Sequence, residues 1–577
     1  MFGHRRRTAR RGPGSYYRQA FAEGTRLSVT DASAVAREWA DWATSVGNVE
    51  EAAEAYWRLV NQVPEEVSRR LTWTARADVI AAGAGTAAES GYWLLRAGRI
   101  RDAAVAVELA RAILIRQRVQ RIPPDLETRL DRIRRLDLYS AYVRAADRLD
   151  DVQRRQHGGG VPDAVPPLVV GDARYWTGGV SAAQAAWSDY ERALQDVRNT
   201  LGEDAIVRPD YGLLRSAASE TPLAYIAAAE RGGYAIVIRP GSDEPLPLLL
   251  KDLSLESVEV VLENYRAVVA DSLGSAARLD DILGWLWTAI MSAVVTALPN
   301  GTALTIVPVG PLCLLPLHAA AEPSGKRGPR RYACDRLAIR YVPSAYALLT
   351  SKRTWTAAGS GPALAVDAPA VPGHPRLSRA ADETRAVQDL LRPHCLRLAD
   401  ARVHDVAGRL DSTSVWHFAC HGHADTTDPL NSSLVLTDRA MTLRQILSLP
   451  MGKHRLAVLS ACETSVPDHR RYDEVISFPG ALLQAGVASV IATSWQVEDT
   501  AAMCLVLKFY SLWLHGRPTV FALAAAQRWI RDATNAQIQA LLPRLYSKPE
   551  NVPAEAWGGI RRFAAPRYWA SFSLTGY

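Results

Sequence analysis

The chain has 577 residues, of which 48% are hydrophobic and 22% are charged, and its formal net charge is +7. This length exceeds what a single hydrophobic core supports, so we expect two or three folded domains. No uninterrupted apolar run approaches the roughly 18 residues that span a bilayer, and no apolar stretch follows the basic start as in a secretory signal. We therefore expect a cytoplasmic protein without a membrane partner.

Positive charge is spread along the chain. The basic residues are nearly all arginine, and most are interspersed with acidic residues, as in RLDRIRRLD. Only the first residues form a concentrated basic patch, and we expect residues 1–30 to be a basic N-terminal tail. A solvated tail is a simpler interpretation than a phosphate-binding one. Direct contact with nucleic acid is therefore not expected.

Cysteine is sparse, and its positions show no paired spacing: Cys313, Cys334, Cys395, Cys420, Cys462 and Cys504. In a cytoplasmic protein this pattern predicts free thiols and no disulfide framework. We expect no cofactor.

Residues 31–157 have the periodicity of helices. Two helical hairpins are indicated, with Gly47 and Gly98 in their turns and paired alanines after each turn. The first hairpin resembles the second half of a tetratricopeptide (TPR) motif at Gly47, Ala52, Tyr56 and Pro64. The two turns are further apart than the roughly 34 residues of a regular array. The region is therefore TPR-like, and it is either a binding surface for a protein or a helical cap on the following domain.

The chain after this region changes character. A Gly- and Pro-rich stretch at residues 158–172 predicts a linker, and residues 173–220 predict a connecting helix. From residue 221 to 577, short apolar runs alternate with helical patterns, after a hairpin around Arg231–Gly233. The runs are 303–309, 337–343, 362–368, 414–420, 455–461 and 488–494. This alternation predicts an α/β domain with a mainly parallel sheet flanked by helices.

Two of the predicted strands deliver reactive side chains at their carboxyl ends, where ligands bind in open α/β sheets. In SVWHFACHGHA, strand alternation places His417 and His421 on one face and Cys420 on the other. His421 is expected to end the strand, before Gly422. In RLAVLSACET, Cys462 leaves the strand behind small residues, where a neighbouring imidazole can hold it as the reactive thiolate. The order His then Cys, and a spacing close to the ~50 residues of caspase-type peptidases, suggest a catalytic pair.

Other interpretations of these residues exist. A lone Cys after a strand is commonly a small buried hydrophobe, and a lone His at a strand end is commonly structural. Zinc is a further alternative because His417, Cys420, His421 and His423 are close in sequence. Alternation separates Cys420 from the histidines, and no second cluster follows, so no metal site is expected. His417 is expected to support or pack against the site.

The C-terminal region as a whole resembles a known family. The segments VWHFACHGHAD, LAVLSACETS and GALLQAGVASVIATSWQVED are similar to those of CHAT-domain proteins, a caspase- and separase-like group often fused to TPR regions. The resemblance covers roughly residues 220–577 and implies a caspase-like fold. It implies that Cys462 is the nucleophile and His421 the general base and acid. It also implies that the amides of Gly422 and Cys462 form an oxyanion hole, in which one donor is worth about 3–4 kcal/mol.

The resemblance also bears on specificity. In related peptidases that cleave after basic residues, an acidic side chain lines the pocket, and here Asp473, Glu474 and Asp499 are candidates. Relatives commonly carry a glycine–leucine pair where this chain has Ser477 and Phe478, so the pocket differs from theirs. These acids are otherwise simply solvated loop charges.

Two functions from different classes follow. The first is a regulated cysteine endopeptidase that cleaves a specific protein partner and is activated by a protein bound to the helical region. The resemblance places such an enzyme in a prokaryotic defence (antiviral) or cell-death pathway. The second is a catalytically silent caspase-like scaffold that binds protein partners through its helices.

Overall fold

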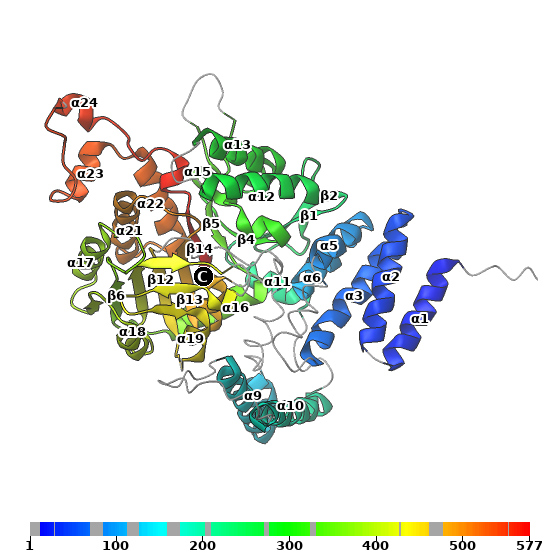
Figure 1. The fold of residues 1–577 in the computed structure, drawn as a ribbon. Coiled ribbons are helices and arrows are strands. Elements are labelled where there is room, and N and C mark those ends of the chain that lie inside the picture. The colour runs from blue at the N-terminus through cyan, green and yellow to red at the C-terminus, as the bar shows by residue number, and fades with distance from the viewer. Residues whose placement is uncertain are drawn as a thin grey trace, which may run out of the picture.

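The computed structural model describes residues 12–27, 29–69, 83, 85–111, 126–157, 174–201, 209–270, 276–323, 330–425, 429–449, 451–460, 477–551 and 553–577. The described elements before residue 220 are all helices (Figure 1). They are α1 (Pro13–Leu27), α2 (Val29–Ser45), α3 (Val49–Arg69), α5 (Thr86–Arg96), α6 (Ile100–Ala110), α8 (Leu126–Arg132), α9 (Leu136–His157), α10 (Arg174–Leu201) and α11 (Tyr211–Ala217). The N-terminal region is therefore helical, as predicted.

An 11-stranded sheet forms the centre of the remaining chain. Its spatial order is β3 (Leu246–Leu250), β2 (Gly232–Ile238), β1 (Leu223–Ala229), β4 (Ala303–Pro308), β5 (Ala338–Tyr341), β14 (Phe572–Gly576), β13 (Val487–Thr493), β12 (His454–Leu459), β8 (Val415–Ala419), β6 (Ala363–Asp367) and β7 (Cys395–Leu398). Neighbouring strands are parallel except in the pairs β3–β2, β2–β1 and β14–β13. A small sheet contains β9 (His421–His423), β10 (Ser433–Val435) and β11 (Ala440–Thr442).

Helices cover both faces of the large sheet. One face carries α12 (Leu255–Ala270), α13 (Ala276–Leu286), the π-helix η2 (Trp287–Met291), α14 (Ser292–Thr296), α17 (Ala380–Leu390), α21 (Asp499–Leu514) and α22 (Thr519–Asp532). The other carries α16 (Ala345–Ala357), α18 (Val403–Leu410), α19 (Leu443–Ser448) and α20 (Phe478–Gln484). The remaining elements are η3 (Gly310–Leu314), η4 (Leu317–Ala319), α15 (Ala333–Arg336), η5 (Pro429–Asn431), α23 (Asn535–Leu541), α24 (Ala554–Gly558) and η7 (Pro566–Tyr568). The predicted α/β class with a mainly parallel sheet is confirmed.

The two predicted helical hairpins are present. They are α2–α3 and α5–α6, and Gly47 and Gly98 have φ of 68° and 73° in their turns, a conformation that glycine adopts without strain. Ala52 and Ala103 are fully buried in the seams of the hairpins. Whether the hairpins belong to the TPR class stays a prediction, as do the domain boundaries.

Helix α1 corrects the prediction of a tail that extends to residue 30. Residues 1–11 lie outside the described residues, but Pro13–Leu27 is helical. Tyr17 stacks on Trp42 with ring centroids 5.6 Å apart, and Phe21 is buried. The basic residues of this segment predict a tail, but Tyr17 and Phe21 stand four apart and so share one face of a helix.

The hairpins share a hydrophobic core with the sheet. Side chains of α2, α3, α5 and α6 pack in one cluster with Tyr225 and Tyr234 of β1 and β2. The Tyr234 hydroxyl donates to the backbone carbonyl of Ala88, 3.0 Å away, and the Tyr92 hydroxyl donates to that of Arg231 at 3.2 Å. The helical region is therefore fastened to β1–β2, whereas α9 and α10 pack on each other in a separate cluster (Figure 1).

Glu108 on α6 forms another contact between the helical region and the sheet domain, and its side chain is fully buried. Its carboxylate accepts hydrogen bonds from the Tyr225 hydroxyl at 2.7 Å and from the backbone amides of Ala345 and Tyr346 at 2.9 and 3.0 Å. Those amides are the first two of α16, where the helix dipole and unpaired N–H groups favour a negative charge. A carboxylate in the helical region thus caps a helix that packs on the sheet.

Among the described residues, one helical run is long and apolar enough to cross a bilayer. It is Arg278–Thr296, with 19 residues and a mean hydropathy of 1.3. The sequence does not indicate this run as a membrane span, because Asp280 and Asp281 interrupt its apolar pattern. More than half of it is buried inside the structure, where Leu283 and Ile290 are fully enclosed by the core. A core helix of a folded domain has these properties.

We expect Glu108→Gln to destabilise the protein by about 1.5–3 kcal/mol, because the neutral amide replaces a buried carboxylate that accepts three hydrogen bonds. Thermal and urea unfolding of the full chain measure this. The matched control is Glu244→Gln, which removes an exposed ion pair with Arg101 and should cost less than about 1 kcal/mol. Equal effects of the two substitutions would contradict the role assigned to Glu108.

Candidate active site

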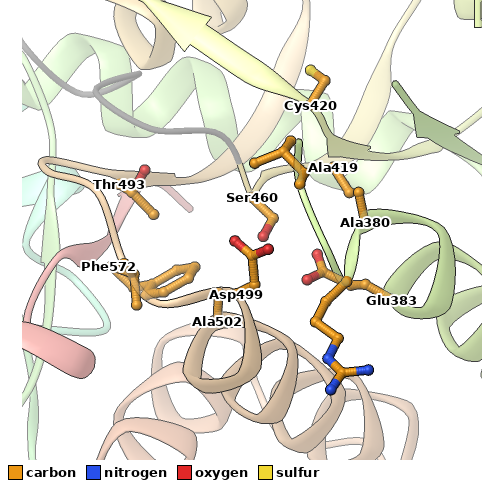
Figure 2. Close-up of a pocket in the computed structure, with 12 residues that line it drawn as sticks. Ala380, Glu383, Ala419, Cys420, Ser460, Thr493, Asp499, Ala502 and Phe572 are labelled. Carbon is orange, nitrogen blue, oxygen red and sulfur yellow. The ribbon is translucent and has the colours of Figure 1, made fainter. Parts of the chain in front are cut away.

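Three neighbouring parallel strands end together at one edge of the sheet. Phe418 of β8 lies beside Leu459 of β12, and Val458 of β12 lies beside Ile491 of β13. Residues at the ends of these strands, Cys420, Ser460 and Thr493, line one cleft that encloses about 440 Å³, part of it open to solvent (Figure 2). The two segments predicted to carry reactive side chains therefore follow strands that are neighbours in the sheet, β8 and β12.

His421 lies just beyond β8 in a way that differs from the prediction. It does not end the central strand, which stops at Ala419; it begins β9 of the small sheet, opposite Val435. The chain leaves the large sheet at Cys420 because β9 turns to pair with β10. Gly422 follows in β9, opposite Leu434.

The imidazole of His421 is held through one nitrogen. Its Nε2 lies 2.7 Å from the backbone carbonyl of Pro375, and a carbonyl only accepts, so Nε2 carries the proton and donates. Nδ1 is then the unprotonated nitrogen of the neutral ring and is available as a base. His421 is 8% exposed, and the ring of His374 lies against it with centroids 5.0 Å apart. No pattern in the sequence pointed to Pro375, since the group it supplies is a backbone carbonyl.

The same loop also holds an acid. Three residues after Pro375, Ser378 donates from its backbone amide and its hydroxyl to Oδ2 of Asp499, at 2.7 and 2.8 Å. Asp499 begins α21 and lines the cleft, and in Figure 2 its carboxylate faces Ser460. One loop after β6 therefore positions both His421 and Asp499.

Three predicted site residues lie outside the described residues: Cys462, Asp473 and Glu474. Ser460 is the last described residue before them, and Ser477 is the first after them. The Ser477 hydroxyl accepts from the amide of Gly480 and caps α20, and Phe478 is 1% exposed in the core. Phe478 therefore serves packing and does not line the cleft. The roles of Cys462 as nucleophile and of Gly422 and Cys462 as oxyanion donors stay predictions.

His417 occupies a different environment from His421. It is 1% exposed, and its Nε2 donates to Oε1 of Glu383 at 3.0 Å, while the Tyr510 hydroxyl lies 3.5 Å from Nδ1. Both ring nitrogens are thus occupied, which fits the supporting role predicted for it. Cys420 packs in the cluster on the opposite face of the sheet. Within the described ranges, His, Cys, Asp and Glu form no group of three or more arranged to hold a metal.

Glu383 is the acid that the sequence reasoning missed. It comes from α17, is 3% exposed and lines the cleft together with Asp499 and Arg379. Arg379 is turned to other partners: it donates to the carbonyl of Leu545 at 3.0 Å and lies 3.6 Å from Asp382. Ala380, Glu383, Thr384 and Val387 follow the spacing of a buried helix face, and an acid in that stripe was the available signal.

Comparison with known proteins places this site in a family. The strands that surround the cleft belong to an α/β domain with a mainly parallel sheet, the class that the sequence predicted. The CHAT domain model matches residues 280–577, just over half of the chain. The chain therefore belongs to the CHAT domain family.

Similarity to individual proteins is weaker. No curated protein sequence matches the chain. Among solved structures, it is similar to two crystal structures of the Saccharomyces cerevisiae separase–securin complex, at 8% identity and TM-scores of 0.43 and 0.42. These matches cover 98% of this chain but 52% and 53% of those chains, so this chain spans about half their length. The Arg-specific cysteine proteinase gingipain R matches at 9% identity and a TM-score of 0.30, covering 56% of this chain and 74% of that one.

The contrast between the two histidines is testable. We expect His417→Gln to destabilise the fold by about 1.5–3 kcal/mol, because it disturbs a buried hydrogen bond to a carboxylate. Below its melting temperature the variant should keep reactivity at the active-site thiol within about tenfold of wild type. His421→Gln should show the reverse, with a small change in melting temperature and loss of thiol reactivity. Thermal melts and labelling with an electrophilic peptide measure both, and equal loss of labelling in the two variants would give His417 a part in the chemistry.

Proposed function

We propose that the protein is a cysteine endopeptidase in which Cys462 and His421 are the catalytic pair. The observation that carries this proposal is the geometry of His421: its Nε2 donates to Pro375, so Nδ1 is free to accept a proton. The strands that lead to His421 and Cys462 are hydrogen-bonded neighbours that end at the same cleft. Membership in the CHAT family supports the assignment.

The proposed reaction begins with transfer of the Cys462 thiol proton to Nδ1 of His421. The thiolate then attacks the scissile peptide carbonyl and forms a C–S bond, and the negative charge passes to the carbonyl oxygen. The amides of Gly422 and Cys462 are proposed to stabilise that oxyanion. The imidazolium donates its Nδ1 proton to the leaving amine as the C–N bond breaks, which leaves a thioester. Water, deprotonated by Nδ1, then attacks the thioester. The C–S bond breaks, the acid is released, and the imidazolium returns its proton to the Cys462 sulfur.

The Pro375 carbonyl contributes by orienting the ring and by stabilising the imidazolium. It does so without a third catalytic side chain, because a carbonyl dipole accepts from Nε2 in both charge states of the ring. A pair made of one thiol and one imidazole therefore suffices in this arrangement. Pro375 is a positioning residue, since it acts only through His421.

An electrophilic peptide probe tests the catalytic pair. We expect it to label Cys462 in the full chain and to fail on Cys462→Ala and on His421→Ala, with the other cysteines unlabelled. Mass spectrometry of the labelled peptide identifies the site, and Cys313→Ala is the control because Cys313 is half-buried outside the cleft. Labelling that survives His421→Ala at the wild-type rate would contradict the proposed base.

We further propose that the cleft selects a basic residue before the scissile bond. Asp499 supports this proposal: both of its hydrogen bonds fall on Oδ2, and Oδ1 receives none from the described residues. Glu383 adds a second carboxylate to the cleft wall. Asp473 and Glu474 remain candidates for the same pocket.

Asp499→Asn should reduce kcat/KM for substrates with Arg or Lys at that position by roughly 100-fold, because a desolvated charge pair is replaced by a neutral contact. The neighbouring Glu498→Gln is the matched control. Glu498 pairs with Arg562 at 2.9 Å and does not line the cleft, so its substitution should change kcat/KM less than about threefold. Peptide libraries that vary this residue provide the measurement. An unchanged preference in Asp499→Asn would assign the pocket to another acid.

Regulation and context are also proposals. We propose a cytoplasmic peptidase that a protein partner activates through the TPR-like helices, within a prokaryotic defence or cell-death pathway. The family resemblance supports this, as does the core that those helices share with β1 and β2. Because of that shared core, the full chain is the form to test. Coexpression of wild type or Cys462→Ala with candidate partners should reveal fragments that depend on Cys462.

The alternative is a silent scaffold that binds partners and cleaves nothing. The tautomer of His421 counts against the scaffold. A site without chemistry does not require a ring whose Nε2 is held by Pro375 so that Nδ1 is unprotonated. Failure of the probe to label Cys462, even with a bound partner, would favour the scaffold.

A further inference from the structure

A cavity that encloses about 1020 Å³, part of it open to solvent, lies where the helical hairpins meet the sheet. Its walls come from α2, α3 and the start of α5 on one side, and from the β1–β2 turn, α12 and η3 on the other. The charged and polar side chains around it are Arg37, Asp41, Tyr56, Glu89, Glu230 and Glu259. It is separate from the cleft beside His421 and shares no lining residue with it.

The charge of this cavity opposes that of the whole chain. Four carboxylates face it against one guanidinium, whereas the protein has a net charge of +7. Within the part of the chain that the structure describes, the side chains of Asp41, Glu230 and Glu259 make no hydrogen bond or ion pair. Arg231 is nearby but donates to the carbonyl of Thr44 at 2.9 Å and lies over the ring of Trp93. The lining thus holds an excess of carboxylates over cations, with Arg37 as the guanidinium among its lining residues.

The carboxylate of Glu89 is less exposed than those of Asp41, Glu230 and Glu259, and the protein holds it in place. Oε1 accepts from the backbone amide of Glu230 at 2.7 Å, and Oε2 accepts from Nε1 of Trp93 at 3.1 Å. Burial raises the pKa of Glu89, and the neighbouring charge of Glu230 raises it further. A cation between these two carboxylates would relieve both effects.

Tyr56 is the independent sign that a ligand belongs here. Its side chain is 9% exposed and lines the cavity, and its hydroxyl has no hydrogen-bond partner among the described residues. Burial raises the pKa of this hydroxyl, and the charges of Glu89, Asp41 and Glu230 raise it further. A hydroxyl without a protein partner on the wall of a cavity can accept from an N–H donor that enters it.

We propose that this junction cavity binds an arginine or lysine side chain of a partner polypeptide. The inference deepens the proposed function, on which it rests, by giving the chemistry of the activating partner. A guanidinium or ammonium group meets Glu89 and the Tyr56 hydroxyl at the floor. The exposed carboxylates of Asp41, Glu230 and Glu259 at the mouth suit further basic residues of the same segment. The volume exceeds that of one side chain, which fits a peptide segment.

Calorimetric titration of the full-length Cys462→Ala chain tests the proposal without any turnover. The ligand is a blocked hexapeptide of alternating arginine and glycine, and the control ligand replaces each arginine with citrulline, its neutral isostere. We expect binding of the first peptide only. Glu89→Gln and Tyr56→Phe should weaken it, roughly tenfold or more for the lost charge and by less for the hydroxyl. The exposed pair Asp41→Asn with Glu259→Gln repeats the charge test if Glu89→Gln fails to fold.

The matched control is Asp147→Asn, which removes an exposed carboxylate on α9 that does not line the cavity, and binding should be unchanged. Equal binding of the arginine and citrulline peptides, or equal affinity in wild type and the cavity variants, would overturn the proposal. Displacement of the peptide by micromolar spermidine would overturn the polypeptide partner and assign the cavity to a small organic cation. Since the titrated chain is inactive, a failure of the peptidase assignment in the probe experiment leaves this result readable.

Discussion

The last strand, β14, is the constraint on which the rest of the sheet depends. It pairs antiparallel with β13 along five residues and parallel with β5 on its other side, so it joins two sets of strands that run in opposite directions. The backbone there is tightly packed: Gly576 has a φ of 104°, and a Cβ at this position would lie 2.3 Å from the carbonyl oxygen of Ala488. On one side of β14, the strands β13, β12, β8, β6 and β7 all point the same way. Their carboxyl ends therefore meet at one edge, where the cleft lies.

The loop after β6 holds two of the side chains that lie at this edge of the sheet. It supplies a carbonyl from Pro375 to His421 and an amide from Ser378 to Asp499, so the proposed base and the proposed specificity acid share one support. The two contacts are three residues apart in the chain. A movement of this loop would displace both groups together, which couples the reactivity of the site to its selection of substrate.

The sequence predicted the strands better than it predicted the site. Strands buried on both faces read as continuous apolar runs, and β4, β6, β8, β12 and β13 were recognised for that reason. The reversal at β14 depends on contacts between distant parts of the chain, so no local pattern reports it. The break at Cys420 was missed because β9 is only three residues long and exists through its pairing with β10. Pro375 contributes a backbone carbonyl, which every residue type carries, and Ser378 contributes its amide together with a hydroxyl that nothing in the sequence connects to Asp499, so the sequence could not indicate these contacts.

The helical region and the sheet are joined at their junction by a shared core and by hydrogen bonds. Glu108 caps α16 from within the core, and Glu89 accepts the amide of Glu230 at the β1–β2 turn, so two carboxylates of the helices are bonded to backbone of the other part. The short helix η3 then leads from the junction cavity, at Gly310 and Pro311, to a second cavity that Cys313 and Leu314 line together with Ser477. Ser477 caps α20 directly after the segment that carries Cys462. A partner that contacts the junction therefore meets the same short helix whose other end lines a cavity with Ser477, so η3 is the element through which the proposed regulation can be sought.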